Sequence, residues 1–138
     1  MAVLTTGGCR CGLVRYECTA DFIATSLCYC RDCQRSSGSA VGCFVLIPRD
    51  ALRRSSGQTT CYTVQNDSGR MMTREFCGEC GSPLFAWTEN IFAVTAASFD
   101  DPAGIKPSMA IWVDSAQPWA PIPCGIERYA KNPAISSG

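Results

Sequence analysis

Seven of the eleven cysteines in this chain fall into three tight clusters, and these clusters constrain the fold more than any other feature. The first cluster is Cys9-Arg-Cys11, the second is CYCRDC at 28–33, and the third is Cys77-Gly-Glu-Cys80. An odd number of cysteines cannot pair completely into disulfides within one chain. Clusters of this spacing in a reducing compartment indicate metal binding or redox chemistry instead.

The first and third clusters are both set among glycines, as in GGCRCG at 7–12 and CGECG at 77–81. A tight glycine-rich turn lets two thiolates face one ion at about 2.3 Å each. Two such turns, brought together from distant parts of the chain, predict a closed tetrahedral zinc site of the structural type. Its four ligands would be Cys9, Cys11, Cys77 and Cys80.

A redox pair of the thioredoxin type is the alternative interpretation of Cys77 and Cys80. That motif normally opens a helix after a strand in an α/β fold. Here Gly81, Ser82 and Pro83 follow, and such a sequence forms helices poorly. The context therefore favours zinc.

The second cluster supplies three thiols and no obvious fourth ligand, because the chain contains no histidine. Its thiols are Cys28, Cys30 and Cys33, and three protein ligands with one open position are the arrangement of catalytic zinc. Zinc is borderline-soft, so the open position suits a substrate thiolate better than an activated water. Two alternatives stay open: a fourth cysteine closes the site, or the thiols bind no metal. The candidates for closing it are Cys18, Cys43, Cys61 and Cys124.

The other candidate residues are interpreted mainly as structural. Cys18, Cys43 and Cys61 lie in apolar strand-like segments and are expected to be small buried residues. We expect the three tryptophans to be core or pocket-wall residues. Three basic residues offer a partner for a substrate carboxylate, although solvated surface charge is the simpler interpretation. The tryptophans are Trp87, Trp112 and Trp119, and the basic residues are Arg31, Arg35 and Lys106.

Composition is that of an ordinary globular protein. The chain has 138 residues, of which 46% are hydrophobic and 17% charged, so it can bury a real core. Its formal charge is zero, which gives no electrostatic attraction to nucleic acid or to an anionic membrane. The N-terminal sequence lacks a secretory signal, and no apolar run approaches the roughly 20 residues that span a bilayer. We therefore expect a soluble cytoplasmic protein without a nucleic-acid partner; the sequence does not indicate an oligomeric state.

Short segments with β-type patterns dominate and predict a single all-β domain over residues 1–127, with one or two short helical turns. The expected strands are 13–18, 22–28, 41–47, 59–64, 71–76, 91–96 and 109–113. A short helix is expected at 31–36, where Gly38 would end it. The ending KNPAISSG at 131–138 is small and polar, which predicts a loose C-terminal tail over residues 128–138.

The cysteine motifs, in this order, are similar to those of one known family. They are GGCRCG at 7–12, CYCRDCQRSSG at 28–38 and FCGECGSPL at 76–84. The later segment SFDDPAGIKPSMAIWVDSAQPW at 98–119 is similar to that family's C-terminal signature. Over nearly its whole length the chain thus resembles the glutathione-dependent formaldehyde-activating enzyme family, which includes centromere protein V.

This resemblance implies an all-β, Mss4-like zinc fold with two zinc ions per chain. It implies a structural zinc on Cys9, Cys11, Cys77 and Cys80, and a catalytic zinc on Cys28, Cys30 and Cys33. It also implies carbon–sulfur lyase activity that joins or splits S-(hydroxymethyl)glutathione. The substrates would be a small thiol, with glutathione favoured, and formaldehyde or a related electrophile.

One position departs from the family pattern. The family often carries a histidine in a P-x-x-H-I stretch, and this chain has Ala110 there. Without any histidine the chain lacks an obvious general acid–base group, so a non-catalytic, zinc-stabilised module that binds a thiol or a partner is the alternative function. Methionine sulfoxide reduction is a second alternative, but it needs a reactive cysteine outside the thiols assigned to zinc.

Overall fold

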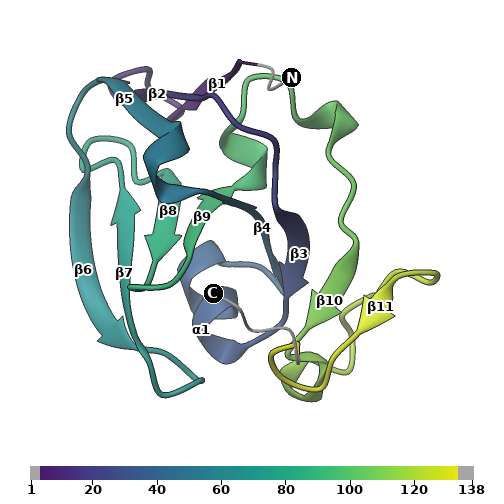
Figure 1. Ribbon diagram of the computed structural model, residues 1–138. Helices are drawn as coiled ribbons and strands as arrows, with labels where there is room; N and C mark the ends of the chain where they lie inside the picture. The colour runs from purple at the N-terminus through teal and green to yellow at the C-terminus, as the bar shows by residue number, and fades with distance from the viewer. Residues whose placement is uncertain (1–3, 134–138) are drawn as a thin grey trace.

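The computed structural model describes residues 4–133, which form eleven strands, one α-helix and short 3₁₀ turns (Figure 1). The strands are β1 (Thr5–Gly8), β2 (Arg15–Cys18), β3 (Ala24–Cys28), β4 (Gly42–Ile47), β5 (Leu52–Ser56), β6 (Thr60–Gln65), β7 (Met71–Phe76), β8 (Pro83–Trp87), β9 (Phe92–Thr95), β10 (Met109–Ile111) and β11 (Glu127–Arg128). The helix is α1 (Arg31–Ser37), and the 3₁₀ turns are Arg49–Ala51, Ala96–Ser98, Pro102–Gly104 and Val113–Ser115. The expectation of an all-β domain with a short helix is confirmed.

The strands form two open sheets. The smaller sheet has the order β1-β2-β5, and the larger has the order β11-β10-β3-β4-β9-β8-β7-β6. Neighbours are antiparallel except β10, which runs parallel to both β3 and β11. Figure 1 shows the small sheet at one end of the molecule and α1 at the other. Within the described residues, no helix is long and apolar enough to cross a membrane.

One hydrophobic core joins the two sheets. Tyr16 of β2 is almost fully buried, and its ring meets those of Phe85 and Phe99 edge-on at centroid distances of 5.2 and 5.6 Å. Its hydroxyl lies 2.6 Å from Oγ of Ser98, so the one polar atom of this ring is satisfied. Edge-to-face aromatic pairs add to the apolar burial that holds the sheets together.

The expected strands overlap observed ones, and β7 has the expected bounds of Met71–Phe76. Strands β1, β5, β8 and β11 are not predicted by the sequence pattern. The sequences TTGG in β1 and LRRSS in β5 carry no alternating apolar face. These strands are held in the sheet by backbone pairing with β2, which a sequence pattern does not indicate. Strand β8 begins at a proline, which is tolerated at the first position of a strand but weakens its pattern.

Helix α1 begins at the predicted residue 31 and extends one residue beyond the predicted end at 36, up to the predicted stop at Gly38. Cys30 is its N-cap, with a thiol that accepts a hydrogen bond from the backbone N–H of Cys33. Gly38 ends the helix with a positive φ of 70°, a conformation that glycine adopts without a steric penalty. The N–H of Gly38 donates to the carbonyl of Gln34, which closes the last turn.

The C-terminal segment differs from the prediction of a loose tail starting at residue 128. The N–H of Tyr129 donates to the carbonyl of Ala110, and the N–H groups of Trp112 and Val113 donate to the carbonyls of Lys131 and Tyr129. Residues 127–133 are therefore attached to the edge of the large sheet. The polar sequence concealed this, because the attachment uses backbone groups. Residues 134–138 of the predicted tail lie outside the described residues.

A buried carboxylate links the two sheets. Glu75 of β7 accepts hydrogen bonds from the guanidinium of Arg54 at 2.6 and 2.9 Å, from the indole of Trp87 at 2.7 Å and from the hydroxyl of Thr59. Burial opposes ionisation of Glu75, but these donors outweigh it and lower its pKa below the ordinary 4.5. Arg54 belongs to β5, so this contact ties the small sheet to β7.

We expect Glu75→Gln to lower the free energy of unfolding by about 1–3 kcal/mol at pH 7, because charged hydrogen bonds are lost in a buried place. A carboxylate with a lowered folded-state pKa stabilises the fold above its unfolded pKa, and this stabilisation is lost as the pH falls through the folded value. The difference from wild type, measured by urea unfolding, should therefore shrink in acid. Glu17→Gln, at a surface pair with Arg53, is the matched control and should change little. An equal effect of both substitutions would contradict this account.

Candidate metal centres and the adjoining cavity

The first and third cysteine clusters meet in space as the sequence predicts. The sulfur atoms of Cys9, Cys11, Cys77 and Cys80 all lie within 4.8 Å of one another. The Cys9–Cys11 sulfur distance is 3.6 Å and the Cys11–Cys77 distance is 3.8 Å. Ligands on a tetrahedral zinc with bonds of about 2.3 Å are separated by about 3.8 Å. This four-thiol group can therefore hold a metal ion, and its donors fit zinc.

Local backbone contacts build the four-thiol group. Gly81 has a positive φ of 79°, and its N–H donates to the carbonyl of Cys77, which folds the third cluster into a tight turn. Gly8 must lack a side chain, because a Cβ there would lie 2.3 Å from the carbonyl oxygen of Val14. The N–H of Arg10 donates to Oγ of Ser82 and joins the two turns.

The thiols of this group differ in their surroundings. Cys9 and Cys77 are buried, whereas Cys11 and Cys80 are exposed, so the site lies at the surface. The Ser82 hydroxyl and the backbone N–H groups of Ser82 and Cys11 donate to the Cys80 sulfur and lower its pKa to about 5. At neutral pH this thiol is thus available as a thiolate, which is the form that binds metal.

The second cluster forms a separate group of three buried thiols. Cys28 ends β3, Cys30 caps α1 and Cys33 lies in its first turn, and their sulfur atoms lie within 4.8 Å of one another. Hydrogen bonds from the Cys28 and Cys33 thiols, together with the Cys33 N–H, lower the pKa of Cys30 to about 3. The pKa values of Cys28 and Cys33 are raised instead, so without a metal ion the negative charge of this buried group lies on Cys30.

Among the described residues no fourth cysteine, histidine or carboxylate joins this group. The four cysteines considered for closing it all lie outside both groups. Cys18 is buried, as expected, and Cys43 is half-buried. The expectation of burial is wrong for Cys61, which is exposed because β6 is the edge strand of the large sheet.

A buried arginine accompanies the three thiols. Arg74 of β7 donates to Oδ2 of Asp32 through Nη2 at 2.6 Å and through Nε at 3.2 Å, and its Nη2 lies 3.6 Å from Sγ of Cys33. Its side chain is only 8% exposed, so it places a positive charge beside the thiols inside the protein. The role of Arg74 is not predictable from the sequence, because a single arginine in a strand does not indicate its partner on a distant helix.

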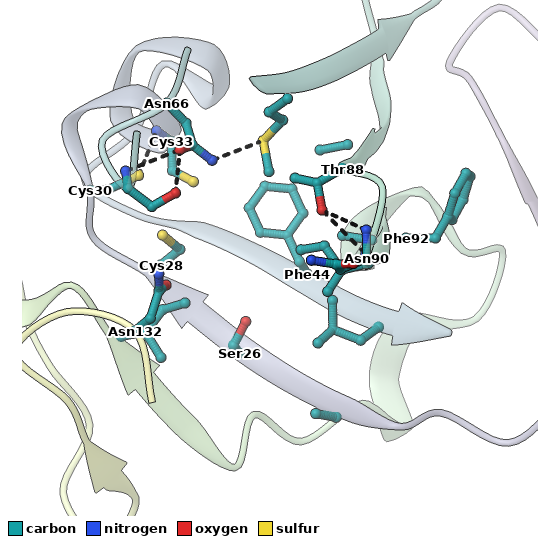
Figure 2. A pocket seen from close by; sticks show the side chains of 18 of the residues that line it. Ser26, Cys28, Cys30, Cys33, Phe44, Asn66, Thr88, Asn90, Phe92 and Asn132 are labelled. Atoms are coloured by element: carbon teal, nitrogen blue, oxygen red, sulfur yellow. Dashed lines mark hydrogen bonds between the residues drawn. The ribbon is translucent and has the colours of Figure 1, made fainter. Parts of the chain in front are cut away.

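The three thiols lie at one end of a cavity of about 560 Å³. Figure 2 shows the thiols at one end, Thr88, Asn90 and Phe92 towards the other, and the ring of Phe44 between them. Phe44, Ile111 and Trp112 pack against the thiol group. The arrangement is a buried sulfur cluster with an incomplete ligand set, opening into a largely apolar cavity.

A sequence model of the GFA family, described as glutathione-dependent formaldehyde-activating enzyme, matches residues 4–115. The chain belongs to this family. A crystal structure of a Rhodobacter sphaeroides protein from structural genomics is similar in fold, with a TM-score of 0.56 and 22% sequence identity. The similarity covers 74% of this chain and 91% of that one. No curated protein sequence shows a significant match to this chain.

The position where the GFA family often carries histidine does not face the cavity. Ala110 is fully buried in β10 and does not line the cavity, whereas its neighbours Met109 and Ile111 do. Successive residues of a strand point to opposite faces, which accounts for this difference. Alanine at this position therefore removes no side chain from the cavity.

Other candidates from the sequence have mixed outcomes. Trp112 lines the cavity, but Trp119 is 71% exposed and lies outside it, so the expectation of a core or pocket-wall position is wrong for Trp119. Trp112 is also the one non-glycine residue with positive φ in the described chain, at 59°, and its indole donates to Oδ1 of Asn132. The three basic residues considered as partners of a substrate carboxylate do not line the cavity, which agrees with the simpler interpretation as surface charge. The arginines that line it are Arg49, Arg70 and Arg74.

We expect the purified protein loaded with zinc to hold about two ions per chain, one in each thiol group. Cys30→Ser should reduce this content to about one, because it removes one of three donors from the buried group. Cys61→Ser is the matched control, since Cys61 lies outside both groups, and should retain about two. Elemental analysis after gel filtration measures the content. One ion per chain in both the wild type and Cys30→Ser would show that the buried group is not a metal site, and two ions retained in Cys30→Ser would show that Cys30 is not a required ligand.

Proposed function

We propose that this chain is a zinc-dependent carbon–sulfur lyase acting on adducts of a small thiol with formaldehyde or a related electrophile. Glutathione is the thiol we favour. The observation that carries the proposal is the buried group of three thiols at the end of a cavity, to which residues 4–133 add no fourth ligand. Membership of the GFA family supports a thiol and an aldehyde as the reacting partners.

We assign different roles to the two thiol groups. The exposed four-thiol group fits a closed structural site that ties the start of the domain to its middle. The buried group of Cys28, Cys30 and Cys33 fits a zinc with one position left for substrate. Zinc bound there would lower the pKa of a ligating thiol and so keep its sulfur anionic at neutral pH.

The residues of this chain hold the buried thiols in place. The Cys33 N–H fixes the Cys30 sulfur, and the Arg74 guanidinium offsets the charge of the thiols. Gln34 is buried and donates to the carbonyls of Tyr29 and Ser115 at 2.7 and 3.1 Å, which anchors α1. Preorganised dipoles and charges of this kind avoid reorganisation during the reaction.

The proposed reaction is a balanced addition without oxidation or reduction. The sulfur of the thiol forms a bond with the aldehyde carbon, and the π electrons of the carbonyl move to its oxygen. That oxygen takes up one proton, and the thiol loses one, so the number of protons is unchanged. The reverse reaction splits the carbon–sulfur bond and releases the aldehyde. Apolar walls such as Phe44 and Trp112 limit access of water to the reacting sulfur.

A non-catalytic module that binds a thiol or a partner is the second candidate. The chain has no histidine, and the carboxylate of Asp32 is paired with Arg74. The other carboxylate of the cavity lining, Asp67, accepts from the N–H of Arg31. Each carboxylate that lines the described cavity thus has a protein partner, which favours a site that binds without assisting proton transfer.

We expect the zinc-loaded protein to accelerate formation of the glutathione–formaldehyde adduct above its spontaneous rate. Exchange NMR at equilibrium measures both directions. Cys30→Ser should return the rate to the spontaneous value, whereas Cys61→Ser should keep the acceleration. Saturable glutathione binding without acceleration in the wild-type protein would instead support the non-catalytic module.

We expect Arg74→Gln to weaken zinc binding at the buried group about 10- to 100-fold, the usual effect of losing a partner of a metal ligand. Competition with a chromophoric chelator measures this affinity. Arg74→Lys should give a smaller loss, because it keeps the charge but not the paired contacts with Asp32. Arg35→Gln, on the exposed side of α1, is the matched control. Equal zinc affinities in the Arg74→Gln and Arg35→Gln variants would contradict a role of Arg74 at the site.

A further inference from the structure

The cavity is polar near the thiols, and Thr88 and Asn90 form a second polar edge at the far end, beyond the apolar part of the floor. The turn between β6 and β7 contributes Asn66, Asp67, Ser68 and Arg70 to the lining. Asp67 accepts a hydrogen bond from the N–H of Arg31 at 3.0 Å, which places this turn beside the start of α1. Figure 2 shows Asn66 near the thiols. A charged or hydrogen-bonding part of a ligand can therefore be accommodated at the thiol end.

Away from the thiols, the floor of the cavity is a sheet face with small side chains. Cys28, Ser26 and Ala24 alternate along β3 and line the cavity together. Across the sheet, Ala24 is paired with Leu46 of β4, Leu46 with Ala93 of β9, and Ala93 with Ala86 of β8. All four residues line the cavity. The four steps along the strand from Cys28 to Ala24 cover about 13 Å. We name this floor the apolar trough and define it as Ala24, Leu46, Ala86 and Ala93; the hydroxyl-bearing Ser26 lies between it and Cys28 along β3.

The charged side chains near the trough already have protein partners. Arg49 donates through Nη2 to the carbonyls of Thr88 and Ile91, and its guanidinium lies 5.0 Å from the Trp87 ring centroid. Arg74 is paired with Asp32, as described above. No residue of the trough itself is charged. A carboxylate or ammonium placed there would lose hydration without an ionic partner, which is unfavourable.

We infer that the electrophile carries an extended apolar substituent, such as an alkyl chain or an aromatic ring, which lies in the apolar trough. The polar thiol then lies towards the turn at 66–70, with its sulfur at the Cys28 end. This inference rests on the proposed function and narrows its substrate class. Formaldehyde has no substituent and would leave the trough unfilled.

The chemistry is the same addition with a larger aldehyde. The thiol sulfur bonds to the carbonyl carbon, the carbonyl oxygen becomes a hydroxyl, and the proton count is unchanged. The product is a thiohemiacetal whose carbon bears the apolar group. Each methylene that enters the trough should improve binding about two- to fourfold, as expected for removal of a methylene from water. The gain should end once the trough is filled.

Binding is tested first, with probes that do not react. S-methyl-, S-butyl- and S-hexylglutathione carry an alkyl group where the adduct would carry its carbon, and calorimetry with the zinc-loaded protein gives their Kd values. We expect Kd to fall by about two- to fourfold per methylene. Ala24→Phe should abolish this gain by filling the trough, whereas Ala103→Phe, at an exposed position outside the cavity, should keep it.

Turnover is tested second, with glutathione and formaldehyde, butanal or hexanal. We expect kcat/KM to rise with chain length in the wild-type protein and to stay flat in Ala24→Phe. Wild-type affinities and rates independent of chain length would overturn the inference, and acceleration with formaldehyde would then leave the proposed function standing. Preference for alkyl thiols over glutathione would also overturn it, because the apolar group would belong to the thiol. Chain-length-dependent binding without acceleration for any aldehyde would support the trough and refute the lyase activity.

Discussion

Two opposite charges, buried on consecutive residues of β7, connect this strand to α1 on one side and to the small sheet on the other. Arg74 points to α1 and reaches Asp32 and the Cys33 sulfur, whereas Glu75 reaches Arg54 of the small sheet. Neither charge is stable inside a protein without its partner, so each fixes the element that supplies the partner. The chain then continues from β7 into Cys77 of the four-thiol group. One strand thereby positions both thiol groups and both sheets.

Much of this arrangement is predictable from the sequence, because it depends on local spacing. The thiol groups follow from short cysteine motifs among glycines, and α1 follows from its position between Cys30 and Gly38. The strands paired mainly through their backbones were missed, since β1 and β5 bury no alternating apolar face. The partner of Arg74 lies 42 residues away, and a sequence pattern carries no record of such a contact.

The cavity likewise combines a part that can be predicted from neighbouring residues with a part that depends on distant ones. Its thiols are adjacent in sequence, but its floor combines small residues from β3, β8 and β9, which only the strand register brings together. Position 110 shows that a sequence difference can also suggest a functional change that the structure does not support. A histidine-for-alanine difference suggests lost chemistry when read as sequence, yet Ala110 lies on the face of β10 away from the cavity. Family membership fixes the motifs better than it fixes what surrounds them.

The two thiol groups also differ in when they can assemble during folding. Cys28, Cys30 and Cys33 span six residues, so closing that loop costs little entropy and needs only a turn of helix. Cys11 and Cys77 are separated by 66 residues and meet only after most of the domain has been synthesised. The local group is thus complete early, before β7 brings Arg74 to it. The distant group can form only later, once the two sheets have come together.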